Sequence, residues 1–317
     1  MKTIPFHSLT IPVSRLILGT ALPALMAGGE ADEVLDAALA AGITTFDTAR
    51  SYRGAEKAFG AWVARRGVRN RINIQTKGCN PDQTGLKFTP DSLRGELETS
   101  LSMLGTDHVE LYALHRDDPS VPAGVFIETL NTFKQEGKIL HFGASNWTWQ
   151  RMAEANDYAA AHGLEGFTFG SPAFSLAVVV GDPWGGSVHL SGAENADARA
   201  WFLQSALPVF PYSGLARGFF SGKYRTDRDA SPLDVLRPET CAEYDCPDNR
   251  ERLRRAEAMA AERGCTVGQI CLAWILAQPI TFCPIIGPSN PQHLAENLRG
   301  LELELSDKDC RWLNLEA

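Results

Sequence analysis

Short apolar runs rich in β-branched residues alternate with amphipathic helical patterns along almost the whole chain. The runs predict strands at 15–18, 43–46, 72–75, 108–114, 139–143, 166–169, 207–212 and 280–286. The helical patterns follow them at 31–41, 53–66, 90–104, 121–136, 148–162, 195–206, 249–277 and 291–300. Because parallel strands need long crossover connections, usually helices, this alternation indicates a parallel sheet.

The helix predicted at 90–104 has unusually complete boundary signals. Thr89 and Pro90 suit the N-cap and the first helical position, and Gly105 suits the position that ends a helix. Between them, four leucines recur at helical spacing and would form one apolar face: Leu93, Leu97, Leu101 and Leu104.

Eight strand-and-helix units without a break in composition predict a single (β/α)8 TIM barrel domain over residues 1–317. The N-terminal segment is expected to form a short hairpin at the base of the barrel. Two irregular stretches, 177–193 and 224–248, would be long loops after strands six and seven, on the face where barrels place their active sites.

Composition and charge narrow the class of protein. The 317 residues are 44% hydrophobic and 21% charged, which is typical of a soluble globular protein. The net charge of -8 argues against a general nucleic-acid binder or a basic membrane-surface protein. We expect a cytoplasmic protein, because there is no long apolar span or secretory segment, and the seven cysteines include no C-x-x-C pair.

Four residues with useful chemistry lie at or just beyond the ends of predicted strands: Asp47, Tyr52, Lys77 and His115. A lysine ammonium favours the phenolate of a nearby tyrosine, and a carboxylate keeps a buried lysine protonated. A neutral imidazole can donate to a carbonyl oxygen. Together the four could transfer a proton at an oxygen whose carbon undergoes redox, although each alone has an ordinary structural explanation.

Two loops suit phosphate binding. Residues 212–218 follow strand seven and residues 287–291 follow strand eight, where barrels often hold phosphate. Arg217 and Lys223 could add positive charge, and ordinary Gly-Pro turn chemistry is an equally good explanation of either loop. The chain has no G-x-G sequence, and its scattered histidines and unpaired cysteines predict no metal site.

The segment Phe46-Asp47-Thr48-Ala49-Arg50-Ser51-Tyr52 resembles the F-D-T-A-x-x-Y signature of the aldo-keto reductases. Further matching motifs follow in the order of that family, at 76–78, 114–115, 143–146, 212–218 and 296–297. The resemblance implies hydride transfer between a nicotinamide and a carbonyl carbon. It also implies that Tyr52 is the general acid, assisted by Asp47, Lys77 and His115.

The resemblance further implies a nicotinamide-dinucleotide site. Ser145 and Asn146 would hold the carboxamide and Tyr212 would stack on the nicotinamide ring. The remaining cofactor-binding positions implied are Gly19, Thr20, Ser171, Ser213, Gly214, Leu215, Ala216, Arg217, Lys223, Gly287, Ser289, His293, Glu296 and Asn297.

Three positions depart from the family pattern. Ser171 stands where the family often has Gln, and Asn290 and His293 stand where many members have Arg or Lys. The expected cofactor is NADP, with NAD possible.

Arg116, Trp147 and Trp184 are candidates to line an apolar substrate pocket. Alternatively, Trp147 packs beneath the fifth helix and Arg116 pairs with a neighbouring aspartate. The expected partner is a small carbonyl or alcohol, with no nucleic acid or membrane, and the sequence leaves the oligomeric state open.

The leading hypothesis is an NAD(P)H-dependent carbonyl reductase or alcohol dehydrogenase. One alternative is a nicotinamide-binding regulatory subunit of the same fold with little turnover, like the potassium-channel beta subunits. Another is a barrel lyase or isomerase without a nicotinamide, against which the phosphate-type loops and Ser145-Asn146 argue.

Overall fold

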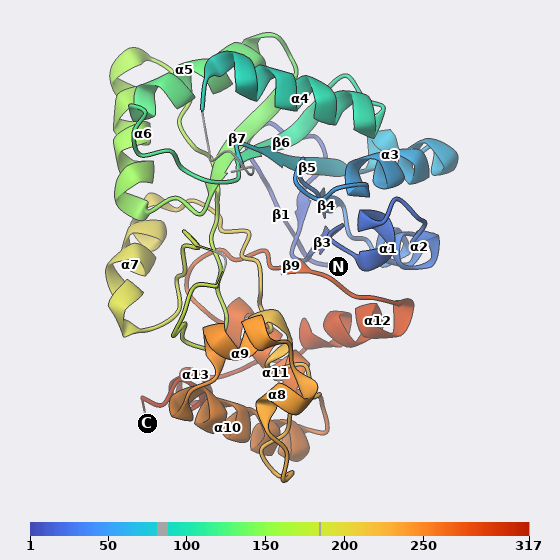
Figure 1. Cartoon of the computed structure of the whole chain (residues 1–317), viewed down its shortest axis with the longest axis vertical. Coiled ribbons are helices and arrows are strands. Elements are labelled where there is room, and N and C mark those ends of the chain that lie inside the picture. Colours follow the sequence, from blue (N-terminus) through green and yellow to red (C-terminus); the bar gives the residue numbers. More distant parts are fainter. Residues whose placement is uncertain (81–87, 184, 317) are drawn as a thin grey trace. The chain divides into compact units, whose positions relative to one another are not determined.

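The computed structural model describes residues 1–80, 88–183 and 185–316 (Figure 1). The chain divides into two compact units. The first unit contains residues 1–171 and 287–291, and the second unit contains residues 172–286 and 292–317.

The first unit is built on six parallel strands that pair in the order in which they occur along the chain. They are β3 (Ile17–Gly19), β4 (Thr45–Asp47), β5 (Asn73–Gly78), β6 (Val109–Leu114), β7 (Ile139–Ser145) and β8 (Gly170–Ser171). Their residues are almost all buried, as expected for parallel strands that are covered on both faces. All six carboxyl ends therefore lie at the same edge of the sheet.

The helices of the first unit connect these strands. They are α1 (Pro23–Met26), α2 (Asp32–Ala40), α3 (Ala55–Arg66), α4 (Pro90–Leu104), α5 (Ala123–Gln135) and α6 (Trp149–His162), with a 3-10 turn η1 at Arg69–Arg71. Helices α3 to α6 pack side by side in chain order (Figure 1). The structure confirms α4 at the predicted bounds: Thr89 and Ser92 form a capping box, and Gly105 ends the helix at φ 66°.

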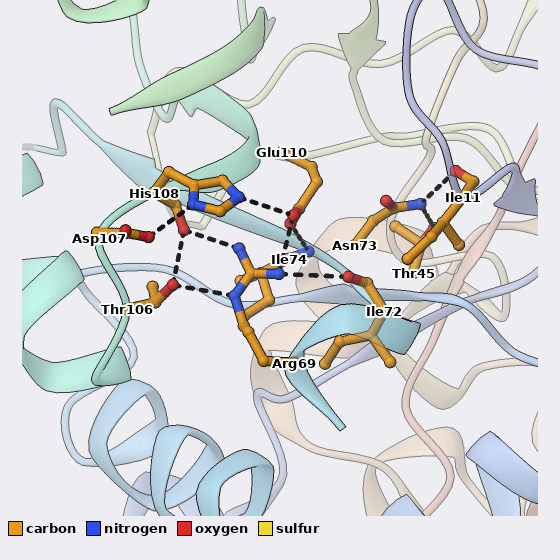
Figure 2. A network of polar contacts seen from close by, with 10 residues as sticks. All are labelled: Ile11, Thr45, Arg69, Ile72, Asn73, Ile74, Thr106, Asp107, His108 and Glu110. Carbon is orange, nitrogen blue, oxygen red and sulfur yellow. Dashed lines mark hydrogen bonds and ion pairs between the residues drawn. The ribbon is translucent and has the colours of Figure 1, made fainter. Parts of the chain in front are cut away.

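The predicted N-terminal hairpin is confirmed by β1 (Thr3–Ile4) and β2 (Val13–Ser14), which pair antiparallel. Ser14 Oγ accepts hydrogen bonds from the backbone amides of Thr44 and Thr45, at 3.1 and 3.2 Å. Asn73 Nδ2, at the start of β5, donates to the carbonyl of Ile11 at 3.0 Å (Figure 2). The hairpin thus covers the amino ends of the strands, opposite the polar carboxyl ends.

A second polar network occupies the same amino-terminal edge (Figure 2). Arg69 Nη1 pairs with Glu110 Oε1 at 2.8 Å, and Arg69 Nη2 donates to the carbonyl of His108 at 2.8 Å. Glu110 Oε2 accepts from the amide of Ile74 at 2.7 Å. The network ties η1 to β5 and β6 through a buried carboxylate, which is a structural role typical of this edge.

The second unit has little regular strand structure. It contains β9 (Ile285–Ile286) and parallel single-residue bridges from Ala173 to Tyr212 and from Val209 to Phe282. The strands predicted at 207–212 and 280–286 are therefore much shorter than expected, and the one predicted at 166–169 begins later, as β8. Prolines at 172, 208, 211 and 284 lack the amide proton that a longer ladder needs.

The rest of the second unit is helical. One of its helices, α12, begins at Pro291, a residue that belongs to the first unit. The helices of the second unit are α7 (Ala196–Ser205), α8 (Pro232–Val235), α9 (Pro238–Tyr244), α10 (Pro247–Arg263), α11 (Val267–Leu276), α12 (Pro291–Gly300) and α13 (Asp307–Leu313), with 3-10 turns η2 (Ala193–Asn195) and η3 (Ala216–Gly218).

Two predictions in this part of the chain need correction, and one helix was missed. The helical pattern at 249–277 is two helices, because Gly264 ends α10 at φ 63° and Thr266 caps α11. The stretch 224–248 is not wholly irregular, because α8 and α9 each begin at a proline within it. Helix α13 was not predicted, although Ser306 and Asp309 form its capping box. Over the described residues of 177–192, the only regular pairing is a bridge from His189 to Ala173.

Candidate active site

The four predicted catalytic residues lie together at the carboxyl edge of the first unit. Asp47 ends β4, Lys77 lies near the end of β5, His115 follows β6, and Tyr52 lies in the turn before α3. Lys77 Nζ is 2.5 Å from Asp47 Oδ1 and 3.4 Å from the hydroxyl of Tyr52, to which it donates. The rings of Tyr52 and His115 meet edge to face, with centroids 5.9 Å apart.

Asp47 and Lys77 form a buried ion pair, with side chains that are both 3% exposed. Burial raises the pKa of Asp47, against the opposing effects of Lys77 and of Gln75, whose Nε2 donates to Oδ1 at 2.9 Å. Burial alone would lower the pKa of Lys77, but Asp47 and Tyr52 outweigh it and raise that pKa. Lys77 is therefore an ammonium, and it directs one of its protons at the Tyr52 oxygen.

His115 is held as a neutral imidazole. Burial lowers its pKa well below the ordinary value, and the nearby cations Lys77 and Arg116 lower it further. Its backbone is fixed on both sides: the amide donates to the carbonyl of Gly78 at 2.7 Å, and the carbonyl accepts from Asn146 Nδ2 at 3.1 Å. A neutral ring at this position can donate one hydrogen bond to a substrate oxygen.

The sequence did not predict the groups that hold the Tyr52 turn in place. The carboxylate of Glu56, fully buried at the start of α3, pairs with Arg50 at 2.8 Å and accepts from Thr76 Oγ1 at 2.7 Å. The amide of Arg50 donates to the carbonyl of Lys77 at 2.9 Å. Nothing in the spacing of these residues indicates the contact, because it joins a loop, a helix and a strand.

The predicted cofactor residues of the first unit gather at the ends of β3, β7 and β8. Ser145 Oγ donates to the carbonyl of Ser171 at 2.7 Å and accepts from Asn146 Nδ2 at 3.1 Å. Asn146 has φ 56°, a left-handed conformation that asparagine tolerates better than most residues. Thr20, after Gly19, donates its amide to the carbonyl of Asp47 at 2.7 Å. The same unit contains Gly287 and Ser289, which are both exposed.

The second unit contains the other predicted cofactor residues, and the loop from Tyr212 to Gly218 has an unusual backbone. Ser213, Ala216 and Arg217 all have positive φ, at 58°, 47° and 51°. Within the described part of the chain, the amides of Gly214 and Leu215 have no hydrogen-bond acceptor. Consecutive amides displayed by such a backbone form a concave anion-binding surface.

The basic residues near this loop differ in their surroundings. Arg217 Nε lies 2.6 Å from Glu243 Oε2, so part of its charge is already compensated within the second unit. Lys223 is exposed. His293, Glu296 and Asn297 lie on α12, where Gln269 Nε2 donates to the carbonyl of Glu296 at 2.9 Å.

The substrate candidates are the least supported part of the predicted site. Trp147 is only 2% exposed and packs between Phe126 and Phe167, with centroids 5.1 Å from each, as the packing alternative requires. Arg116 is half-buried, and the neighbouring Asp117 pairs with Arg151 at 3.1 Å. Trp184 lies outside the described residues.

Two features associated with other classes of protein are absent from the described residues. No three histidine, cysteine or acidic side chains in this part of the chain form a metal-binding group. None of the described helices has the length and apolar character that spanning a membrane requires.

Parallel strands thus carry a buried Asp47–Lys77 pair at their carboxyl ends, within hydrogen-bond distance of the half-buried Tyr52, as expected of a barrel oxidoreductase. Residues 15–314 match the model of the aldo/keto reductase family, and the chain belongs to this family. Its members are (β/α)8 barrels and oxidoreductases that use nicotinamide cofactors on small carbonyl substrates, so the predicted fold class and family are confirmed.

Several named proteins are similar to this chain. Aldo-keto reductase str7 of Strobilurus tenacellus is 29% identical over 284 residues, which cover 87% of this chain and 78% of that protein. An aldo-keto reductase of Schizosaccharomyces pombe, yakc, whose name specifies NADP(+), is 29% identical over 282 residues (86% and 78%). A putative voltage-gated potassium channel subunit beta of the same yeast is 28% identical over 282 residues (82% and 76%).

Proposed function

We propose that this protein is an NADPH-dependent reductase that converts aldehydes or ketones to alcohols, and that also catalyses the reverse reaction. The observation that carries the proposal is the chain of contacts from the buried Asp47–Lys77 pair to the hydroxyl of the half-buried Tyr52, with spacings of 2.5 and 3.4 Å. A structural ion pair would not need a tyrosine hydroxyl at its end, whereas a tyrosine that donates a proton near neutral pH needs a group that lowers its pKa, as an adjacent cation does.

In the proposed mechanism, each of the four residues has a separate role in proton transfer or hydrogen bonding. Tyr52 donates its hydroxyl proton to the carbonyl oxygen as negative charge develops there, and Lys77 stabilises the resulting tyrosinate. Asp47 keeps Lys77 protonated in its buried position. His115, as a neutral imidazole, donates a hydrogen bond to the same oxygen and orients the carbonyl. A bound nicotinamide supplies the hydride.

The proposed cofactor residues divide by the part of the nucleotide that they would hold. Ser145, Asn146, Ser171 and Tyr212 would hold the nicotinamide end, with Gly19 and Thr20 beside it. The loop 213–217 suits the pyrophosphate, because the amides of Gly214 and Leu215 lack a protein acceptor among the described residues. Lys223 is the better candidate for an additional phosphate contact, since Arg217 already pairs with Glu243.

The adenosine half is proposed to lie against Gly287, Ser289, His293, Glu296 and Asn297. We further propose that residues 1–317 form one catalytic domain and that the enzyme acts in the cytoplasm. Arg116 remains in the proposed substrate pocket, as does Trp184, which rests on the sequence alone. The buried packing of Trp147 argues for leaving it out.

Cofactor binding tests the proposal most directly. The seven tryptophans provide intrinsic fluorescence for titrating the purified protein with NADPH and, separately, with NADH. Tighter binding of NADPH, followed by NADPH consumption with a panel of aldehydes and ketones, is the expected result. Binding of neither nucleotide would overturn the proposal, and equal binding would remove the preference for NADP.

The alternative of a regulatory subunit has one specific observation in its favour, the similarity to a protein named as a putative potassium channel subunit beta. A subunit of that kind would bind NADPH with comparable affinity but turn over very slowly. Single-turnover and steady-state rates measured on the same preparation distinguish the two functions.

A further inference from the structure

The hydroxyl of Ser51 contacts the side chain of His115. Ser51 Oγ lies 3.3 Å from Nδ1 of the imidazole ring. Ser51 immediately precedes Tyr52 in the turn before α3, and no other described residue hydrogen-bonds to either ring nitrogen. The other nitrogen, Nε2, is therefore available to a substrate.

A neutral imidazole carries one proton, and the partner of one nitrogen decides which nitrogen keeps it. The low pKa of His115 keeps the ring neutral. If a hydroxyl donates to Nδ1, the proton must lie on Nε2. A carbonyl or carboxylate acceptor in the place of Ser51 would fix the opposite arrangement, with a lone pair at Nε2 facing the substrate oxygen.

Both partners of this contact are held by the same strand. The amide of Arg50, next to Ser51, donates to the carbonyl of Lys77, and the amide of His115 donates to the carbonyl of Gly78. These two carbonyls belong to consecutive residues of β5. The ion pair of Arg50 with the buried Glu56 fixes the turn from its other side. The Ser51–His115 distance is thus set by backbone contacts to β5 and by this ion pair.

We propose that Ser51 is a positioning residue that donates to Nδ1 of His115 and so keeps the imidazole proton on Nε2, the atom that donates to the substrate's carbonyl oxygen. The inference rests on the proposed reductase function and deepens it. It assigns the imidazole proton of His115 to Nε2. The position of the ring alone does not show which nitrogen carries this proton. Because Ser51 is exposed, water can partly replace it, and we expect a moderate effect.

The ring tautomer can be read without any turnover. In protein with ¹⁵N-labelled histidine, the long-range ¹H–¹⁵N spectrum of the apo protein at neutral pH distinguishes the two tautomers, and the His115→Asn variant identifies the signals. We expect a single Nε2-protonated ring in the native protein. The Ser51→Val variant, which lacks the hydroxyl, should give a mixture of tautomers. The Ser51→Thr variant, similar to valine in shape but carrying a hydroxyl, should restore the native spectrum.

Kinetics supply the second readout. We expect Ser51→Val to lower kcat about three- to tenfold, as fits the loss of one hydrogen bond, with the affinity for NADPH unchanged and with recovery in Ser51→Thr. An Nδ1-protonated ring in the native protein, or native-like spectra and rates in Ser51→Val, would overturn the assignment. If the protein consumes no NADPH at all, the proposed function fails, while the spectrum still shows whether Ser51 sets the tautomer.

Discussion

Each end of the parallel sheet in the first unit carries a carboxylate paired with a cation. The two pairs differ in the other groups to which they are hydrogen-bonded. At the amino ends, Arg69 donates to Glu110 and to three further oxygens, and Glu110 also accepts from a backbone amide (Figure 2). At the carboxyl ends, Lys77 directs a proton at the Tyr52 oxygen, 3.4 Å away. Among the residues that the structure describes, the partners of the first pair are structural, whereas the second pair contacts a hydroxyl that could donate a proton.

The two pairs also differ in burial and in the cation used. The side chains of Asp47 and Lys77 are each 3% exposed, against 9% for Glu110 and 22% for Arg69. A planar guanidinium can satisfy several fixed acceptors at once, which suits a structural network. An ammonium is a compact charge that can stabilise a developing tyrosinate. We therefore expect mutations at the amino-terminal edge to change stability and mutations at the carboxyl-terminal edge to change activity.

The largest effect is expected from Tyr52→Phe. Removing the proton donor should lower kcat by about 10²- to 10⁴-fold while leaving NADPH binding nearly unchanged, because the hydroxyl is needed for chemistry rather than for affinity. Steady-state kinetics and fluorescence titration measure the two quantities. The matched control is Tyr158→Phe on α6, where the lost hydroxyl donates to Glu128. Appreciable turnover in the Tyr52 variant would refute its role as the acid.

The second prediction distinguishes the contribution of the Asp47–Lys77 ion pair to stability from the contribution of Lys77 to activity. Lys77→Met should lower kcat about 100-fold or more and destabilise the fold by about 3 kcal/mol, because it leaves Asp47 buried without its partner. The double variant Asp47→Asn with Lys77→Met should recover much of the stability, since no buried charge remains, but none of the activity. Urea unfolding and initial rates give the comparison. Recovery of both properties together would mean that the pair is only structural.

At the opposite edge, Glu110→Gln should affect stability alone. We expect a loss of about 2 kcal/mol in the free energy of unfolding, because a buried charged hydrogen-bond acceptor is replaced by a neutral group. The kcat of the folded enzyme should remain within twofold of the native value. A large fall in kcat at a temperature where the variant is fully folded would contradict the division between the two edges.

The smallest expected effect is a dependence of stability on pH. Because the pKa of His115 lies well below its ordinary value of 6.5 in the folded protein, the unfolded chain takes up a proton first as the pH falls. Stability should therefore decrease below pH 6.5, by at most about 1.4 kcal/mol per pH unit from this residue. Urea midpoints between pH 7.5 and 5.5 test this. The His115→Gln variant should show a shallower slope.

Local signals explain which parts of the fold were predictable. Helix α4 was predicted at its bounds because Thr89, Pro90 and Gly105 fix its ends by short-range chemistry. The break at Gly264 was missed, although Gly264 and Thr266 carry local signals of the same kind. The strands of the second unit were overestimated because apolar runs interrupted by Pro208, Pro211 and Pro284 cannot sustain a ladder.

The candidate site was predictable as far as it lies at strand ends. Asp47, Lys77 and His115 each follow or end a buried run, and parallel strands bring their carboxyl ends together. Glu56 and Ser51 were not predicted as parts of the site, because their contacts depend on how α3 and its turn lie against β5. Trp147 shows the same limit: the sequence allowed a pocket or a packing role, and only its contacts with Phe126 and Phe167 distinguish the two.

The N-terminal hairpin has a consequence for synthesis on the ribosome. Phe6 packs against His141 and Phe169, with ring centroids 5.6 and 6.2 Å away, so its binding surface is completed more than 160 residues later. At a translation rate of roughly 5–20 residues per second, the nascent hairpin waits on the order of ten to thirty seconds for its partners. The hairpin thus emerges before the residues that it contacts and can dock only after they have been synthesised.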